Sequence, residues 1–300
     1  MKENNKKIKN IKKYINKGNA SVLQQLKQIQ QEKKEIEKEK RQLEKEKTEL
    51  AERLKQRNII TGGRYPKKYL FGALGDTQYG SLYANQDIID LAYKEFVKEG
   101  VKIVYHTGDL VDGENVYKGH TYEINVHGFD AQTKKVVDNY PYYKGIVTKF
   151  ITGNHDLSYW KSIGADVGSH INNQREDMQY LGREQILEEV MIGKQKVKIL
   201  LVHPGKGSAY AISYHSQKFI EAISGGRKPH LVLSGHTHKA IHIPGYRNVD
   251  LFQTGCTQSQ TPFMMRNNLA AVTGFWIIEV TINTKRLVAV KAKFYHFFEK

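Results

Sequence analysis

Cysteine and proline are scarce in this sequence, which has one cysteine, Cys256, and six prolines among its 300 residues. A single cysteine excludes an internal disulfide and a zinc site built from several thiolates, and it fits a reducing compartment. Long apolar runs are also missing, since stretches such as 199–202 and 275–278 are far too short to span a bilayer. The first ten residues are charged and no apolar segment follows them, so we expect no signal peptide. These absences predict a soluble, cytoplasmic protein without a membrane partner.

Acidic residues are outnumbered, because 31 Asp and Glu stand against 47 Lys and Arg, which gives a net charge of +16. Such an excess favours an anionic partner, and we expect nucleic acid. With 39% hydrophobic residues, the chain can bury one sizeable core and carry an appendage besides.

Residues 1–60 are the candidate appendage. They hold 18 Lys and Arg, nine Glu and no Asp, so +9 of the net charge lies in one fifth of the chain. Their apolar residues recur every seven positions, at Ile8, Ile15, Val22, Ile29, Ile36, Leu43 and Leu50. Gly18 and Asn19 indicate a helix stop and Ser21 a new start, so we expect a short basic helix followed by a long one over 21–56.

The long helix admits two interpretations. If the sevenfold residues form one half of a coiled-coil seam, three lysines in the other half weaken it, although three neighbouring glutamates could pair with them across a parallel homodimer. The lysines are Lys33, Lys40 and Lys47, and the glutamates are Glu32, Glu39 and Glu46. The helix would then serve for dimerisation and as a basic arm for nucleic acid. A solvated or partly disordered helix explains the same pattern equally well. Residues 61–66 are typical of a linker, so the predicted domains are 1–60 and 67–300.

From Tyr69 onward, strand-like and helix-like segments alternate, which predicts a layered α/β domain. Five apolar runs are expected to be strands, at 69–74, 101–105, 147–151, 197–202 and 231–233. Amphipathic helices are expected at 86–98 and 209–223. After Gly245, the runs 249–253, 274–282 and 287–298 alternate as antiparallel strands do, and we expect them to complete a second sheet.

Each of the five runs ends in a turn that carries polar side chains, usually next to a glycine that lets the backbone turn tightly. The side chains are Asp76, Gln78, Asp109, Asn154, His203, His236 and His238. If the five strands are neighbours in one sheet, these side chains converge on the edge where open α/β sheets bind ligands. Taken singly, each has an ordinary explanation, such as a turn residue or a hydrogen-bonded structural histidine. Their occurrence in five successive strand ends favours a site.

Oxygen and nitrogen ligands without a thiolate suit divalent ions such as Mn²⁺, Fe²⁺, Zn²⁺ or Ni²⁺. Seven ligands are too many for one tetrahedral ion, but they suit two ions that share a carboxylate. Two ions roughly 3.5–4 Å apart can hold a bridging hydroxide and neutralise a phosphoryl oxygen, as hydrolytic two-metal sites do.

At these residues the sequence resembles the calcineurin-like metallophosphoesterases. Their ordered motifs D-x-H, GDxxD, GNH(D/E), a strand-end His and GHxH are matched over residues 69–240, with one departure. The resemblance implies a two-sheet αββα sandwich. It assigns one metal to Asp76, Gln78, Asp109 and His238, and the other to Asp109, Asn154, His203 and His236. It also implies that His155 acts at the leaving oxygen as a cation or proton donor, oriented by Asp156 or Asp112.

The departure is Gln78, because most members of the superfamily have histidine there. An amide oxygen is neutral and harder than imidazole, so the first metal is expected to bind less tightly or to favour Mn²⁺, the ion we expect first. Every other ligand and His155 are present, so we expect an active enzyme. The alternative is a nucleic-acid-binding scaffold with a vestigial site.

The substrate is the least determined feature. The spacing of Asp76 and Gly80, the GDLVDG segment and the basic charge resemble the SbcD-type DNA-repair exonucleases and their phage relatives. The segment between the second and third motifs, which also contains His120 and His127, interleaves tyrosines with lysines. Such a mixture suits stacking on unpaired bases, although a lid of packed tyrosines explains it as well. The residues are Tyr117, Tyr122, Tyr140, Tyr142 and Tyr143, with Lys118, Lys134, Lys135 and Lys144.

We therefore expect a two-metal phosphodiesterase that cleaves nucleic acid through a metal-bridging hydroxide. A phosphodiesterase or phosphatase for cyclic or small nucleotides is the alternative.

Overall fold

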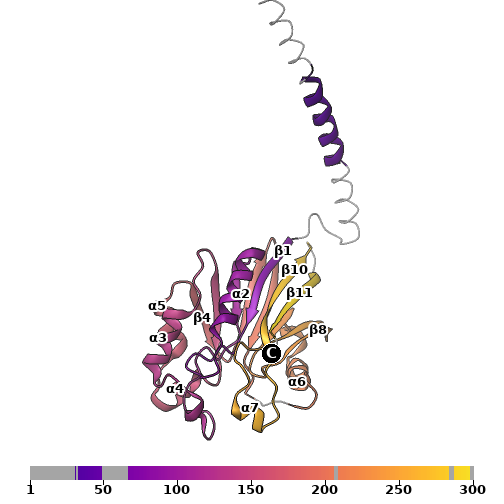
Figure 1. Cartoon of the computed structure of the whole chain (residues 1–300). Helices are drawn as coiled ribbons and strands as arrows, with labels where there is room; N and C mark the ends of the chain where they lie inside the picture. Colours follow the sequence, from indigo (N-terminus) through magenta and orange to yellow (C-terminus); the bar gives the residue numbers. More distant parts are fainter. Residues whose placement is uncertain (1–30, 32, 49–66, 206–208, 284–286, 298–300) are drawn as a thin grey trace, which may run out of the picture. The chain divides into compact units, whose positions relative to one another are not determined.

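The computed structural model describes residues 31, 33–48, 67–205, 209–283 and 287–297. The chain divides into two compact units, Met1–Tyr65 and Pro66–Lys300. In the first unit, residues 31 and 33–48 are helical and exposed (Figure 1). Ile36 and Leu43, which belong to the predicted seam, are 51% and 55% exposed. The other apolar residues of the sevenfold repeat, the predicted stop at Gly18, the start at Ser21 and the linker 61–66 lie outside the described residues.

The larger unit contains two sheets, and the first has the strand order β11-β10-β1-β2-β3-β4. Strands β1 to β4 run parallel to one another. Strand β10 pairs antiparallel with β1, and β11 pairs antiparallel with β10. The bounds are β1 Lys67–Leu74, β2 Ile103–His106, β3 Val147–Thr152, β4 Met178–Arg183, β10 Thr273–Ile282 and β11 Leu287–Phe297.

The second sheet has the strand order β5-β6-β7-β9-β8. Its three inner strands, β6, β7 and β9, are parallel, and the edge strands β5 and β8 are antiparallel to their neighbours. The bounds are β5 Gln185–Ile192, β6 Gln195–Val202, β7 Leu231–Ser234, β8 Ala240–Tyr246 and β9 Val249–Thr254.

The two sheets face each other across an apolar core that includes Phe71, Tyr105 and Ile151 from the first sheet and Leu233 and Phe252 from the second. All of these side chains are fully buried. Successive residues of a strand point to opposite faces, so the inner strands of the first sheet must be apolar on both sides. This requirement explains why the inner strands appear in the sequence as continuous apolar runs.

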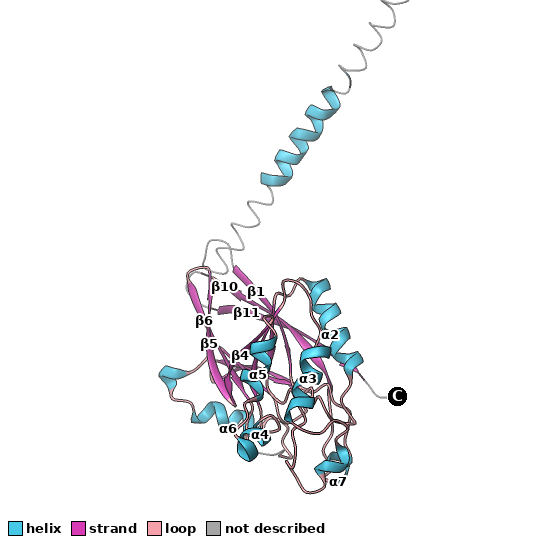
Figure 2. Ribbon diagram, turned by 90° about the vertical axis from the view of Figure 1, so that its left-hand side faces the viewer, coloured by secondary structure: helices cyan, strands magenta, loops and turns pink. Residues whose placement is uncertain are grey.

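Helices cover the outer faces of both sheets. On the first sheet, residues of α2, α3 and α5 share a second buried cluster with Val104 and Phe150 (Figure 2). On the second sheet, Ile220 of α6 packs with Val232 and Leu251. The helix bounds are α2 Gln86–Glu99, α3 Phe129–Asn139, α4 Leu157–Ile163, α5 Val167–Gln174, α6 Tyr214–Ala222 and α7 Pro262–Arg266, and the 3₁₀ turns are η1 His120–Glu123 and η2 Gly225–Arg227. The predicted αββα sandwich is confirmed. None of the helices in the described ranges combines the length and apolarity needed to cross a bilayer.

Two predictions about the sheets were wrong. The late strands β10 and β11 extend the first sheet instead of completing the second, and β9 lies parallel to β7. The five strands that carry the predicted ligands do not share one sheet, because β1, β2 and β3 belong to the first and β6 and β7 to the second. Alternation of polar and apolar residues indicates that a segment is a strand, but it carries no information about which neighbour the strand pairs with.

Several elements were missed or misplaced. The strands β4, β5 and β8 were not predicted, and their burial is only partial along most of their length. The helix expected over 209–223 begins at Tyr214, because residues 210–213 form bends and turns. The helices α3, α4, α5 and α7 were also not predicted. All are short, and their apolar stripes are correspondingly weak.

Candidate metal centre

The seven predicted ligands lie in the turns at the carboxyl ends of five parallel strands. Asp76 and Gln78 follow β1, Asp109 follows β2, and Asn154 follows β3. His203 follows β6 in the second sheet, and His236 and His238 follow β7. The face-to-face packing of the sheets brings these two groups of turns together. A hydrogen bond connects them directly, since the backbone N–H of His236 donates to Asp76 Oδ1 at 3.1 Å.

The backbone of this edge is unusual. Five of the seven predicted ligands have φ between 50° and 74°, a region that non-glycine residues rarely adopt. They are Asp76, Gln78, Asp109, His236 and His238. Each such residue costs on the order of 1–3 kcal/mol and persists only where the surroundings impose it. The concentration of strained residues at one edge is typical of a functional site.

The glycines of the motifs leave room for the ligands. A Cβ on Gly153 would lie 2.3 Å from Asp109 Oδ1 and 2.7 Å from the His203 ring. A Cβ on Gly108, whose φ is +102°, would lie 2.7 Å from His203 Nδ1. Glycine is therefore required at both positions by the close approach of Asp109 and His203, which come from different sheets.

One group of side chains meets around Asn154 and Asp109. His203 Nε2 lies 3.1 Å from Asp109 Oδ2 and 3.0 Å from Asn154 Oδ1. His236 Nδ1 lies 2.8 Å from the same Asn154 oxygen. Ligand atoms of Asp109, His203 and His236 all lie within 4.8 Å of one another, close enough to bind one ion. The structure thus brings together the four residues that sequence reasoning assigned to the second metal.

A second group of predicted ligands includes Asp76, Gln78 and His238, and it also meets Asp109. His238 Nε2 lies 3.3 Å from Asp76 Oδ1, and Gln78 Nε2 donates to Asp109 Oδ2 at 3.3 Å. The other amide atom, Gln78 Oε1, is buried and has no hydrogen-bond partner among the described residues. A buried polar atom without a partner is costly, and a cation beside it would remove the cost. The residues present therefore fit a first metal that has an amide oxygen among its ligands.

The electrostatics of the centre suit divalent cations. Burial lowers the pKa of His203, but the Asp109 carboxylate outweighs burial and raises it to about 9. Burial opposes the ionisation of Asp109, yet His203 and the neighbouring histidines hold its pKa well below the ordinary value. Burial and His203 lower the pKa of His236 to about 4. Because metal ligands must be deprotonated, binding of metal would displace the proton from His203 and compensate the buried carboxylates.

His155 is held by its backbone and its ring. Its N–H donates to Asp109 Oδ1 at 2.9 Å. Its Nδ1 lies 2.6 Å from the backbone oxygen of Asp112 and 3.5 Å from Asp112 Oδ1, so Nδ1 carries a proton and Nε2 is the ring nitrogen left for a substrate. Burial lowers the pKa of His155, but Asp109 and Asp112 outweigh it and raise the pKa to about 9.

The two carboxylates proposed to orient His155 have different partners. Asp112 contacts the ring, as just described. Asp156 instead accepts hydrogen bonds from the backbone N–H groups of Leu110, Val111 and Gly153, at 3.2, 2.9 and 2.9 Å. Asp156 therefore ties the turn after β2 to the turn after β3, whereas Asp112 holds the imidazole.

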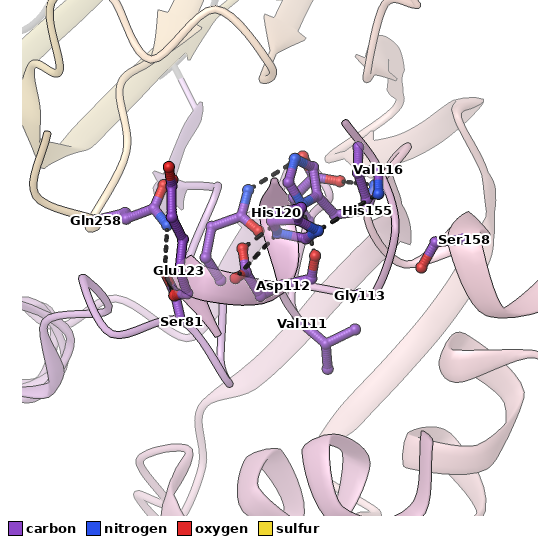
Figure 3. Close-up of polar contacts among 12 residues, drawn as sticks. Ser81, Val111, Asp112, Gly113, Val116, His120, Glu123, His155, Ser158 and Gln258 are labelled. Carbon is purple, nitrogen blue, oxygen red and sulfur yellow. Dashed lines mark hydrogen bonds and ion pairs between the residues drawn. The ribbon is translucent and has the colours of Figure 1, made fainter. Parts of the chain in front are cut away.

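Sequence reasoning assigned no role to His120, which the structure places beside Asp112 (Figure 3). His120 Nε2 lies 3.2 Å from Asp112 Oδ2, and both side chains are buried. The backbone N–H of Val116 points at His120 Nδ1 over 3.4 Å, which leaves Nε2 as the protonated nitrogen. Asp112 thus lies between His120 and His155. Burial raises the pKa of Asp112, but the two histidines outweigh burial and lower it. Nothing in the spacing of His120 from the motifs indicated this contact.

A cavity of about 300 Å³ opens above the centre. Its floor includes Asp109, Asn154, His155, His236 and His238. The cavity is also lined by apolar side chains, called here the apolar wall, which are Val116, Tyr117, Phe263, Met264, Leu269 and Ala270. Gln258, Thr237 and Thr261 add polar groups. A volume near 300 Å³ is at the lower end of small-ligand pockets, so the cavity accommodates a group smaller than a drug-sized ligand.

Comparisons with known proteins cover the same residues. Residues 69–240 match the calcineurin-like phosphoesterase family. Comparison with characterised protein sequences gives no significant match. Among solved structures, the chain is similar to the zinc complex of Vps29 from Entamoeba histolytica, with 14% identity and a TM-score of 0.36 over 76% of this chain and 99% of that one. It is also similar to the phosphoesterase YfcE of E. coli (13% identity, TM-score 0.37, 74% and 98% covered). A third similar structure is the calcineurin-like phosphoesterase YfkN of Bacillus subtilis, with 10% identity and a TM-score of 0.38 over 77% of this chain and 91% of that one.

Proposed function

Because the chain belongs to the calcineurin-like phosphoesterase family, we propose that this metal-dependent phosphoesterase is a two-metal phosphodiesterase of nucleic acid. The observation that carries the proposal is the position of Asp109. Its Oδ2 contacts Gln78 Nε2 and His203 Nε2, one residue from each predicted ligand set, and its Oδ1 accepts from the backbone N–H of His155. A carboxylate in this position can bridge two ions and align the catalytic histidine with them.

The residues divide into two ligand sets that share Asp109. One ion would be held by Asp76, Gln78, Asp109 and His238, and the other by Asp109, Asn154, His203 and His236. When bound, the two ions would supply a deprotonated water as nucleophile and neutralise the phosphoryl oxygens. We propose Mn²⁺ as the native ion, because Gln78 adds a hard amide oxygen to a mixed set of oxygen and nitrogen ligands.

His155 would serve at the leaving oxygen. Its raised pKa, about 9, keeps the imidazole protonated at neutral pH, so Nε2–H is available to donate to the departing alkoxide. The hydrogen bond to the Asp112 backbone fixes the tautomer and the ring orientation. Asp112, supported by His120, stabilises the positive charge of that ring.

The assignment of nucleic acid as substrate is supported by charge and motif. The net charge of +16 favours a polyanion, and the segments Asp76–Gly80 and 108–113 resemble those of SbcD-type exonucleases. The basic segment 1–60 would add phosphate contacts, and its sevenfold apolar repeat would allow a homodimer. The small cavity favours one specific alternative, a phosphodiesterase for cyclic or small nucleotides.

An activity panel with Mn²⁺ tests the proposal. The substrates are linear single- and double-stranded DNA, RNA, cyclic mononucleotides and bis(4-nitrophenyl) phosphate. We expect Mn²⁺-dependent cleavage of DNA or RNA that is lost on chelation and in Asp109→Asn. Cleavage of the small substrates alone would replace the nuclease assignment by the small-nucleotide alternative. If no substrate is cleaved with any divalent ion while nucleic acid still binds, the protein is a scaffold.

A further inference from the structure

The apolar wall of the cavity is built by residues outside the family motifs. Val116 and Tyr117 come from the loop after β2, Phe263 and Met264 from α7, and Leu269 and Ala270 from the loop before β10. Phosphate and metal ions gain nothing from apolar surface, so the catalytic chemistry does not account for this wall. It must contact another part of the substrate or remain in contact with water, which is unfavourable for such a surface.

Two aromatic rings form the centre of the wall. Tyr117 and Phe263 stack with ring centroids 4.1 Å apart and an angle of 24° between their planes. Both side chains are half-buried, as are Val116 and Leu269 of the same wall. A further flat ring can extend such a stack, since offset stacking is a preferred arrangement of aromatic rings.

The ring pair is held rigidly by a buried acid. Tyr117 Oη donates to Glu123 Oε2 at 2.8 Å, and the backbone N–H of Phe263 donates to Glu123 Oε1 at 3.0 Å. Burial and Glu123 raise the pKa of Tyr117, so the hydroxyl remains a neutral donor. Ser81 Oγ accepts from Gln258 Nε2 at 2.9 Å and donates to the backbone oxygen of Glu123 over 3.5 Å, which connects the Gln258 segment to Glu123 (Figure 3). The surface is therefore preorganised, which reduces the entropic cost of binding a ligand ring.

The wall also lies beside the reacting centre. The Tyr117 ring centroid is 6.4 Å from that of His155, and His155 and Tyr117 line the same cavity as Asn154 and His236. A group attached directly to the scissile phosphate would therefore reach the wall while the phosphate lies over the metal ligands.

From this arrangement we propose that the apolar wall is a binding subsite for a flat, uncharged ring joined to the scissile phosphate, namely one unpaired nucleobase. The proposal rests on the function proposed above and names the part of the substrate that the site selects. A base that is paired within a duplex cannot enter a cavity of about 300 Å³, so the site takes a base from a single strand or a strand end. Gln258 and Thr261 also line the cavity and add polar groups to it.

The first experiment measures binding and does not depend on turnover. Calorimetry with Mn²⁺-loaded protein compares thymidine 5′-monophosphate with inorganic phosphate, which lacks the ring. We expect thymidine monophosphate to bind roughly 5- to 150-fold more tightly, the range that stacking of one base provides. Equal affinities would overturn the proposal.

Variants of the wall test which residues cause the preference for thymidine monophosphate over inorganic phosphate. In Phe263→Ala, the ratio of the two affinities should fall towards one, whereas Phe263→Leu, which keeps apolar bulk, should lose only part of it. Met265→Ala is the matched control, because Met265 lies on the same short helix, is 57% exposed and does not line the cavity. Tyr122→Ala controls in the same way for Tyr117→Ala, since Tyr122 is 84% exposed. Because each ratio is taken within one variant, a partly unfolded sample does not change it. An unchanged ratio in both Phe263→Ala and Tyr117→Ala would contradict the subsite.

A hydrolysis assay separates this inference from the proposed function. The substrates are thymidylyl-thymidine and its two analogues in which one base is replaced by hydrogen. We expect one analogue to be cleaved roughly tenfold or more slowly than the parent. If all three are cleaved at the same rate, the subsite is absent and the phosphodiesterase function stands. If none is cleaved while thymidine monophosphate still binds preferentially, the phosphodiesterase function fails and the ring subsite stands.

Discussion

The metal-ligand edge and the apolar wall line one cavity, but they are built in opposite ways. The edge consists of short turns in which strained backbone and glycines place each side chain, as the positive φ of Asp76 and Asp109 shows. The wall consists of side chains from separate loops that meet only through packing and through Glu123. The edge is therefore specified by local sequence and can be recognised as motifs, whereas the wall is specified by tertiary contact and can vary with the substrate.

The largest effect should come from the residue that joins the two ligand sets. Asp109→Asn keeps the shape but removes the bridging charge, so we expect hydrolysis of bis(4-nitrophenyl) phosphate to fall on the order of 10⁴-fold and metal affinity to fall with it. Metal titration and initial rates measure both. Asp250→Asn is a suitable control, because Asp250 hydrogen-bonds His242 and none of the predicted ligands. A bridging role is refuted if the Asn variant binds two ions as the wild type does.

A smaller effect is expected at His155, which contacts the edge without belonging to either ligand set. In His155→Ala, turnover should fall about 10²- to 10³-fold because proton donation is lost, while the number of bound ions stays at two. The matched comparison is Met265→Ala, since Met265 is 57% exposed and does not line the cavity, and we expect it to leave metal binding and turnover of bis(4-nitrophenyl) phosphate unchanged. Full turnover in His155→Ala would show that the leaving oxygen needs no acid from this residue.

The pH profile should distinguish Asp112 from Asp156. With the pKa of His155 raised to about 9, the protonated imidazole predominates at neutral pH, and activity is lost as the pH rises through about 9. Asp112→Asn removes a carboxylate that stabilises this cation, so the loss of activity should move to lower pH by about one pH unit. Profiles of kcat/KM measure the change, and an alkaline limb that does not move contradicts the role of Asp112. Asp156 does not contact the ring, so any effect of Asp156→Asn should appear in thermal stability.

The smallest effect is expected at Gln78, the one departure from the family motif. Gln78→His replaces a neutral amide oxygen by imidazole, and its neighbours His236 and His238 show that histidine tolerates positive φ at this edge. We expect affinity for the first ion to rise about tenfold, with preference moving from Mn²⁺ towards Zn²⁺. Calorimetric titration with each ion measures this. Unchanged binding of both ions would mean that the side chain at position 78 is not a ligand.

Much of the fold could be predicted from the sequence, because buried parallel strands must be apolar on both faces and therefore stand out as runs. The predicted strand over 147–151 became β3, Val147–Thr152, and the predicted helix over 86–98 became α2, Gln86–Glu99. The pairing partners of β9, β10 and β11 could not be predicted in this way. The edge of a sheet that a strand joins depends on contacts with distant segments. The alternation of polar and apolar residues within the strand does not specify those contacts.

For the site, the sequence by itself determined the predicted ligand set, since each predicted ligand is recognised within a few residues by a strand end, a turn and a glycine. Only the tertiary structure decided that the ligands come from two sheets and that Asp112 rather than Asp156 contacts the His155 ring. It also revealed that His120 contacts Asp112 and that Tyr117 stacks on Phe263 at the cavity. The physical reason is range. The conformation of a turn depends on neighbouring residues and can be recognised from a short motif. The partners of a buried side chain depend on packing between segments that lie far apart in the chain.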